Sequence, residues 1–268
     1  MNHINHFFIK TQNYGKIHYA KSGVGQIPVV LTHGWGMSWR VWKKFLEHMD
    51  PEKYTVYAID VTGFGNSDKP GIRYSIDNLA ESLMEFIQAL GINKPIIGGH
   101  SMGVTLCLEA VTRKELDVSG LIIADSGSRS GHRTSEIIKR LEVTTDKRSD
   151  LRSIVKTFFV HINDRDLDAF TTDAMKGTNE SLIGSLQGIS TFDYDPFLGS
   201  LSMPVVIFFG ENDRNRNFDD VQHLHENIPG SELVVIGDAA HCPMYEQPWT
   251  FVSAFEKWAS RNIHFGEE

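Results

Sequence analysis

Hydrophobic and polar residues follow two alternating patterns along this chain. Short runs rich in valine, isoleucine and leucine occur at residues 28–31, 55–59, 95–98, 121–124, 204–209 and 232–236. Such runs are typical of strands buried on both faces of a sheet. Between several of them, apolar residues recur every three or four positions, as they do on one face of a helix. Strands that alternate with helices predict an α/β fold with a mostly parallel sheet flanked by helices.

The clearest helical pattern covers residues 76–90. Its apolar face is made of Ile76, Leu79, Leu83, Phe86, Ile87 and Leu90. Gly91 follows directly and is a typical stop signal. A second helix is predicted over 102–113, and a closing helix over 249–260. Near the start, residues 7–20 predict an antiparallel hairpin that turns at 13–15.

Residues 129–195 interrupt this alternation. They contain charged helical patterns at 135–144 and 151–161 but no convincing buried strand. The stretch is too long for an ordinary loop in a compact domain. We therefore predict a core made of residues 1–128 and 196–268, and an inserted helical cap, or lid, made of residues 129–195.

Composition and charge exclude several classes of protein. With 41% hydrophobic and 22% charged residues in a chain of 268, the sequence is that of an ordinary globular protein. A net charge of −8 disfavours a nucleic-acid partner. Cys107 and Cys242 cannot form a disulfide framework, which fits a reducing compartment. Because neither a secretory signal nor a membrane-spanning run of about 20 apolar residues is found, we expect a cytoplasmic protein without a membrane anchor.

Chemically useful residues follow the ends of the predicted strands, which is where ligands bind in open α/β sheets. Ser101 stands between Gly99 and Gly103 after the third of these strands, and Gly-x-Ser-x-Gly between a strand and a helix is the nucleophile-elbow pattern. Asp213 follows the fifth strand and His241 follows the sixth. A serine, an acid and a histidine therefore come, in that order, to one edge of one sheet.

Five short motifs resemble those of the α/β-hydrolase fold, and together they cover essentially the whole chain. They are the segments 33–36 (HGWG), 60–68 (DVTGFGNSD), 99–103 (GHSMG), 210–213 (GEND) and 240–241 (AH). Thr62 and Val104 depart from the usual pattern, since they replace a frequent proline and a frequent glycine. The resemblance implies an α/β-hydrolase fold with a helical lid, and it says little about the substrate.

The resemblance implies a serine hydrolase that works through an acyl-enzyme. Ser101 is expected to be the nucleophile, His241 the general base, and Asp213 the residue that orients the imidazole. The backbone N–H groups of Met102 and, by resemblance, Trp35 are expected to form the oxyanion hole. We expect no cofactor and no metal, because this reaction needs none and the common phosphate-loop, dinucleotide and zinc motifs are missing from the sequence.

Some residues have competing interpretations. Asp125, at the end of the fourth predicted strand, is a rival for the role of the acid. His33 and His100 belong to motifs but are expected to hydrogen-bond to loop backbone. His223 and His225 lie two positions apart, which places them on different faces of a helix and disfavours a metal pair.

Hydrolysis of a carboxylic ester of a small soluble substrate is the preferred function. The segment 33–37 (HGWGM), with Trp39 and Trp42, is also similar to bacterial esterases that cleave the methyl ester of pimeloyl-carrier protein. Residues 129–156 contain eight Lys or Arg and four Asp or Glu. An acyl-carrier partner at this basic surface is a further hypothesis, although a solvated helical surface is the simpler interpretation.

Other functions use the same triad or the same fold. The first alternative is hydrolysis of a carbon–carbon bond in a β-diketone-like ring-cleavage product, or of a lactone. A ligand-binding receptor, and a cofactor-free oxygenase or perhydrolase, are more remote alternatives. Acyl length, alcohol, stereochemistry and oligomeric state cannot be predicted from the sequence.

Overall fold

The computed structural model describes residues 1–130 and 134–264. Its centre is an eight-stranded sheet in the order β1-β2-β4-β3-β5-β6-β7-β8. The strands are β1 (Asn5–Lys10), β2 (Lys16–Ser22), β3 (Ile27–Thr32), β4 (Tyr54–Ile59), β5 (Ile96–His100), β6 (Gly120–Ala124), β7 (Val205–Gly210) and β8 (Glu232–Ile236). Strand β2 pairs antiparallel with β1 and with β4, and the remaining pairs are parallel. The mostly parallel α/β sheet predicted from the hydrophobic runs is confirmed.

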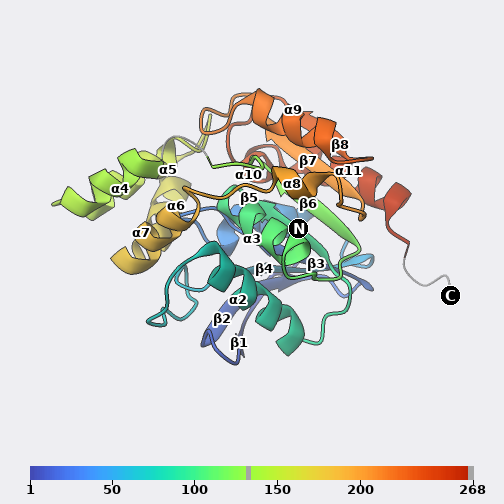
Figure 1. Ribbon diagram of the computed structural model, residues 1–268, viewed down its shortest axis with the longest axis horizontal. Helices are drawn as coiled ribbons and strands as arrows, with labels where there is room; N and C mark the ends of the chain where they lie inside the picture. Colours follow the sequence, from blue (N-terminus) through green and yellow to red (C-terminus); the bar gives the residue numbers. More distant parts are fainter. Residues whose placement is uncertain (131–133, 265–268) are drawn as a thin grey trace.

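Helices surround this sheet (Figure 1). They are η1 (Trp39–Trp42), α1 (Lys43–His48), α2 (Ile76–Ala89), α3 (Met102–Thr112), α4 (Thr134–Val143), α5 (Lys147–Lys156), α6 (Asp164–Met175), α7 (Asn179–Gly188), α8 (Asp195–Leu198), α9 (Phe218–Asn227), α10 (Pro243–Glu246) and α11 (Pro248–Asn262). Helix α2 packs against α3, and α1 packs against α11. Helices α4 to α7 gather at one side of the molecule in Figure 1.

The central strands explain why the sequence shows continuous apolar runs. Every residue of β5, β6 and β7 is buried, because parallel strands with connections on both faces are shielded from water on both sides. Burying one valine or isoleucine side chain contributes about 1.5–3 kcal/mol. By contrast, β1 lies at the sheet edge and is mostly exposed.

Helix α2 begins and ends where its sequence predicts. The Ser75 side chain accepts a hydrogen bond from the N–H of Asn78 at 3.4 Å, which satisfies one free donor of the first turn. At the other end, Gly91 has a φ of +63°, a conformation that glycine adopts without strain. The N–H of Gly91 donates to Gln88 and the next N–H donates to Ile87, which is the Schellman arrangement.

Helices α4 to α7, between β6 and β7, are called the helical insertion below. Within the described part of residues 125–204, no strand joins the sheet, and an isolated antiparallel bridge between Arg129 and Asp193 brings the two ends of the stretch together. The predicted helix at 151–161 is displaced, since α5 spans Lys147–Lys156. The reason is that the Asp146 side chain accepts the N–H of Ser149 at 3.0 Å and starts the helix earlier.

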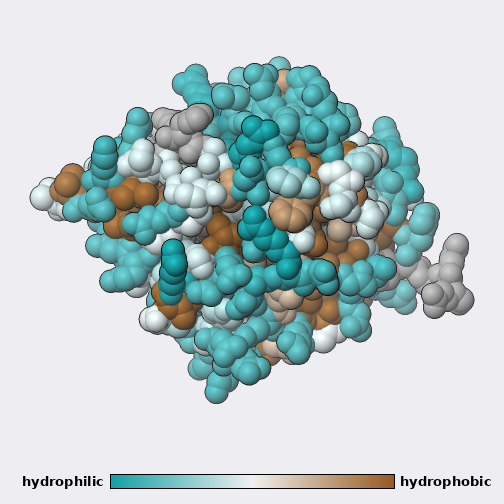
Figure 2. All heavy atoms as spheres, viewed as in Figure 1, coloured by the Kyte–Doolittle hydropathy of each residue, from teal (hydrophilic) through white to brown (hydrophobic). Residues whose placement is uncertain are grey.

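None of the helices in residues 1–130 and 134–264 combines the length and the apolar character needed to cross a bilayer. The face shown in Figure 2 is mostly hydrophilic, with small hydrophobic patches between hydrophilic groups. Cys107 and Cys242 are buried and not joined to each other.

Candidate active site

Ser101 occupies a strained turn between β5 and α3. Its φ of 51° and ψ of −115° lie in a region that non-glycine residues rarely adopt. The N–H of Ser101 is fixed by a 2.9 Å hydrogen bond to the carbonyl oxygen of Ala124 on the neighbouring strand. The turn places Ser101 at the N-terminal end of α3, where free N–H groups and the helix dipole favour negative charge.

Glycines make this turn possible. A Cβ atom at Gly99 would lie 2.3 Å from the backbone of Gly103, and a Cβ atom at Gly103 would lie 2.5 Å from the Thr32 hydroxyl. A Cβ atom at Gly34 would lie 3.2 Å from the Cβ atom of Ser101. A side chain at position 99 or 103 would therefore collide with neighbouring atoms, and glycine avoids these collisions.

Asp213 and His241 are joined directly. The distance from His241 Nδ1 to Asp213 Oδ2 is 2.7 Å, and both side chains are almost completely buried. Asp213 also accepts the N–H of Asn215 at 2.7 Å. Burial alone would raise the pKa of Asp213, but His241 and the N–H groups of Asn215 and Arg216 lower it overall. The carboxylate form is thus the favoured one beside the imidazole.

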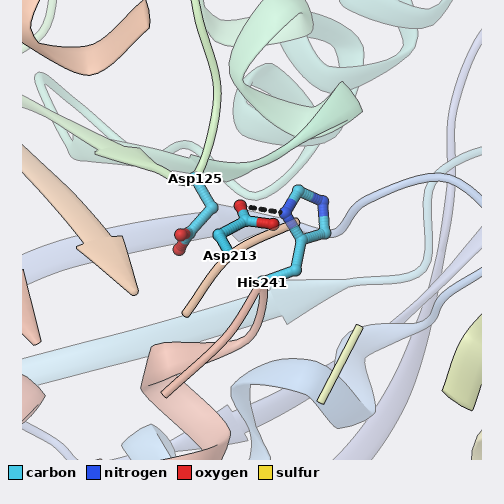
Figure 3. A group of neighbouring side chains, drawn as sticks. All are labelled: Asp125, Asp213 and His241. Carbon is cyan, nitrogen blue, oxygen red and sulfur yellow. Dashed lines mark hydrogen bonds and ion pairs between the residues drawn. The ribbon is translucent and has the colours of Figure 1, made fainter. Parts of the chain in front are cut away.

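Asp125, the rival acid, lies on the other side of Asp213 from His241 (Figure 3). It follows β6, and β6 is the neighbour of β7 in the sheet, so the topology brings the two carboxyl groups together. Its Oδ1 accepts the N–H of Gly210 at 2.8 Å, whereas its buried Oδ2 makes no hydrogen bond within the described residues. Burial, and then the charge of Asp213, raise the pKa of Asp125 well above its usual range. The neutral acid is favoured at Asp125, and Asp213 is the carboxylate that accepts the hydrogen bond from His241.

Among the residues that the structure describes, Asp125, Asp213 and His241 form a group that could hold a metal ion. One ligand atom from each of Asp125, Asp213 and His241 lies within 4.8 Å of the others. An ion at this position would have to replace the hydrogen bond between His241 and Asp213, because the ligand nitrogen is already occupied by it.

The two motif histidines bond to backbone, as expected. His33 is buried, and its Nε2 accepts the N–H of Val61 at 3.0 Å while its Nδ1 lies 2.7 Å from the carbonyl oxygen of Gly34. His100 is also buried, with its Nε2 2.7 Å from the carbonyl oxygen of His241. Burial lowers the pKa of His33 and lowers that of His100 more strongly. The neutral form of both rings is thus favoured, and both rings hold loop backbone in place through hydrogen bonds. The ring of His100 links the serine turn to the segment that carries His241.

Ser101 and His241 line the same pocket, together with Trp35, His100, Thr134, Ile137, Phe158, Leu186, Ile189, Asn215 and Arg216. Within residues 1–130 and 134–264, no hydrogen bond joins the Ser101 hydroxyl to the His241 ring; in ligand-free enzymes such bonds often tighten only when substrate binds. The backbone N–H groups of Trp35 and Met102 make no hydrogen bond to any described residue. They are therefore free to bind an oxygen atom.

Several hydrogen bonds attach the helical insertion to this site, among them one from Nδ2 of Asn215 to the carbonyl oxygen of Thr157 at 3.3 Å. The Trp35 indole nitrogen donates to the carbonyl oxygen of Leu182 in α7 at 2.8 Å. The Glu246 carboxylate accepts the N–H of Val160, after α5, at 2.6 Å, and the N–H of Ala240, next to His241, at 2.8 Å. Burial raises the pKa of Glu246 although these N–H groups oppose that shift.

Arg216 and Glu246 are candidate site residues that the sequence patterns did not indicate. Arg216 lines the pocket three positions after Asp213, and Glu246 lies five positions after His241. Both stand beside motif residues in loops or short helices, which carry no periodic pattern. Their short distance along the chain from Asp213 and His241 is the signal that could have pointed to them.

Comparison with known proteins decides the family. The sequence profile described as the alpha/beta hydrolase family matches residues 29–255, which is most of the chain. The chain belongs to the alpha/beta hydrolase family. All three candidate triad positions of this alpha/beta hydrolase lie within the matched range.

Relatives of this alpha/beta hydrolase have different activities. A 2-hydroxy-6-oxo-6-(2'-aminophenyl)hexa-2,4-dienoic acid hydrolase from Metapseudomonas resinovorans is 27% identical over 255 residues and matches 91% of this chain and 87% of its own. A pimeloyl-acyl-carrier-protein methyl ester esterase from Vibrio vulnificus is 22% identical over 261 residues and matches 91% and 98%. An esterase structure from Exiguobacterium antarcticum has a TM-score of 0.85 at 23% identity and covers 94% and 98%, which shows the shared fold.

Proposed function

We propose that this alpha/beta hydrolase cleaves a carboxylic ester of a small soluble substrate through an acyl-enzyme. The observation that carries this proposal is the 2.7 Å hydrogen bond between Asp213 and His241, because His241 lines the same pocket as Ser101. A serine hydroxyl is a weak nucleophile unless a neighbouring base removes its proton. The neutral imidazole of His241 supplies that base once Asp213 holds the proton on Nδ1.

The reaction has two halves. In the first, Nε2 of His241 takes the proton of the Ser101 hydroxyl while the oxygen attacks the ester carbonyl carbon. The resulting imidazolium gives the proton to the departing alkoxide, so that an alcohol leaves and Ser101 carries the acyl group. In the second, His241 takes a proton from water as the water oxygen attacks the acyl carbon. The bond from that carbon to the Ser101 oxygen breaks, and the imidazolium returns its proton to this oxygen, so that the acid leaves and the serine is regenerated.

The free N–H groups of Trp35 and Met102 support this reaction. Negative charge develops on the carbonyl oxygen during each attack, and fixed N–H donors stabilise it more in the transition state than in the ground state. The start of α3 adds the favourable end of the helix dipole. Removing one such donor typically lowers kcat by about 10²–10³-fold.

We further propose that the helical insertion is the lid of residues 129–195. Its members Thr134, Ile137 and Leu186 contribute to the same pocket as Ser101 and His241. Excluding water from the pocket strengthens its electrostatic interactions. An acyl-carrier partner on the insertion receives less support, because Arg140 and Arg152 are already paired with acidic residues on the insertion itself.

Turnover of p-nitrophenyl esters from acetyl to dodecanoyl tests the function. Wild type is expected to hydrolyse the shorter esters, and Ser101→Ala is expected to lose at least about 10⁴-fold in kcat. A serine-directed phosphonate is expected to label Ser101 in wild type and to fail with His241→Ala. Retained esterase activity in Ser101→Ala would show that another group attacks the ester, and failure to label wild type would favour a binding protein.

A second candidate is hydrolysis of a carbon–carbon bond. It is favoured by the 27% identity to the dienoic acid hydrolase over 91% of this chain. The same triad positions would serve, with a carbanion instead of an alkoxide as the leaving group that receives the proton. Assays with a vinylogous diketone beside a small ester and a lactone separate these activities by their relative kcat/KM.

A further inference from the structure

Arg216 is a cation in the wall of an otherwise largely apolar pocket. Trp35, Phe158 and Leu186 are among the apolar residues that line it, and Arg216 is its one permanently charged residue among the described ones. Arginine keeps its charge in proteins, and a guanidinium presents up to five N–H donors. Burial lowers the pKa of Arg216, which reflects the loss of water around its charge.

The Arg216 charge is not neutralised by a direct ion pair. Within the described residues, its hydrogen bond goes from Nη1 to the carbonyl oxygen of Arg129 at 3.2 Å, and no carboxylate lies within 4.0 Å. The neighbouring carboxylates have other donors. Asp220 accepts the N–H of Asn217 at 3.2 Å, and Asp213 accepts from His241.

A partly dehydrated cation without a paired anion is costly, and a bound anion offsets that cost. Guanidinium groups match the geometry of carboxylates and can bind both oxygens at once. We propose that Arg216 determines specificity by binding a carboxylate of the substrate, so that the preferred substrate is an ester whose acyl part carries a second, free carboxylate. This inference rests on the proposed ester hydrolysis at Ser101.

A matched pair of esters tests it. p-Nitrophenyl hydrogen adipate and p-nitrophenyl hexanoate have the same acyl length and differ in one terminal carboxylate. Wild type is expected to show the higher kcat/KM on the adipate ester. In Arg216→Gln the ratio of the two kcat/KM values is expected to fall about 10- to 100-fold, as is typical of a lost hydrogen bond to a charged group. Arg216→Lys is expected to lie between the two.

Arg148→Gln is the matched control. Arg148 lies on α5 with its side chain half exposed and 4.0 Å from Asp168, outside the pocket lining. The substitution Arg148→Gln removes the same charge as Arg216→Gln. If it lowered the ratio of the two kcat/KM values equally, the substrate would be selected by long-range charge and not by contact with Arg216. Thermal denaturation of each variant by circular dichroism verifies that it folds.

Binding of adipate itself gives a readout without turnover. Calorimetric titration into Ser101→Ala is expected to give a Kd that rises at least about tenfold when Arg216→Gln is added. Equal adipate affinity with and without Arg216, or no measurable affinity in either protein, would overturn the inference. If wild type hydrolyses neither ester and the phosphonate leaves Ser101 unlabelled, the proposed function fails instead, whatever the titration shows.

Discussion

The indole N–H of Trp35 donates to the carbonyl oxygen of Leu182 at 2.8 Å. One residue thereby presents its backbone N–H at the proposed oxyanion hole and its side chain to helix α7 of the insertion. The backbone conformation at Trp35 is therefore coupled to the position of helix α7 over the pocket.

Trp35→Phe should reveal this coupling. Phenylalanine keeps an aromatic ring at position 35 but cannot donate to Leu182, so the free energy of unfolding should fall by about 1 kcal/mol or more. The kcat for a p-nitrophenyl ester should fall as well. Chemical denaturation and steady-state kinetics measure both. The control is Trp249→Phe at an exposed tryptophan, which should change neither, and equal effects of the two variants would contradict the coupling.

Asp213→Asn should abolish most activity with little change in fold. An asparagine cannot hold the imidazole in the required tautomer, and the loss of kcat in such triads is roughly 10⁴-fold. Asp125→Asn should lower kcat by only about fivefold, the worth of a modest hydrogen bond. If the larger loss occurs in Asp125→Asn, the acid of the triad follows β6 and not β7.

Asp125 should also make stability depend on pH. Its pKa is raised in the folded protein, so the unfolded chain releases this proton first as the pH rises above about 3.9. The raised pKa of Asp125 therefore makes its full contribution to the free energy of unfolding below that pH. Above it, the free energy of unfolding falls by about 1.4 kcal/mol per pH unit until the pH reaches the pKa of Asp125 in the folded protein.

Asp125→Asn removes this dependence. Urea denaturation at several pH values from 5 to 8 should show the variant gaining stability relative to wild type as the pH rises. A difference between the two proteins that does not change with pH would mean that Asp125 is ionised in the folded protein.

Gly99→Ala should destabilise the protein strongly. The added Cβ atom would lie 2.3 Å from the backbone of Gly103, so β5 and α3 would have to move apart. Overpacking of this kind costs typically about 1–3 kcal/mol. Gly71→Ala is the control, since no atom lies within 4 Å of a Cβ atom there. Melting temperatures of the two variants should differ by several degrees, and equal values would contradict the close approach.

Periodicity was sufficient to predict the sheet and its neighbouring helices. Runs such as β7 are apolar because both faces are buried, and α2 carries both an apolar face and end signals at Ser75 and Gly91. The expected triad residues followed from motifs at strand ends. Their mutual distances did not, because these depend on the order of the strands in space, which also places Asp125 beside Asp213.

Isolated side chains outside regular patterns escaped prediction. Arg216 carries no periodic signal, and its place in the pocket depends on how helices α4 to α7 pack over the sheet. The displaced start of α5 has a local cause, the Asp146 cap, which competes with the apolar spacing that suggested a later helix.

Glu246 accepts the N–H groups of Val160 and His161 on one side and that of Ala240 on the other. Lifting the insertion away from the sheet would break the two bonds from Val160 and His161 and leave the carboxylate bonded to the N–H of Ala240, the residue before His241. If the insertion is the proposed lid and His241 the proposed base, opening the lid for substrate also weakens the support of the segment that carries the base. In this proposed scheme the open protein admits substrate but catalyses poorly, and hydrolysis follows closure of the insertion over the pocket.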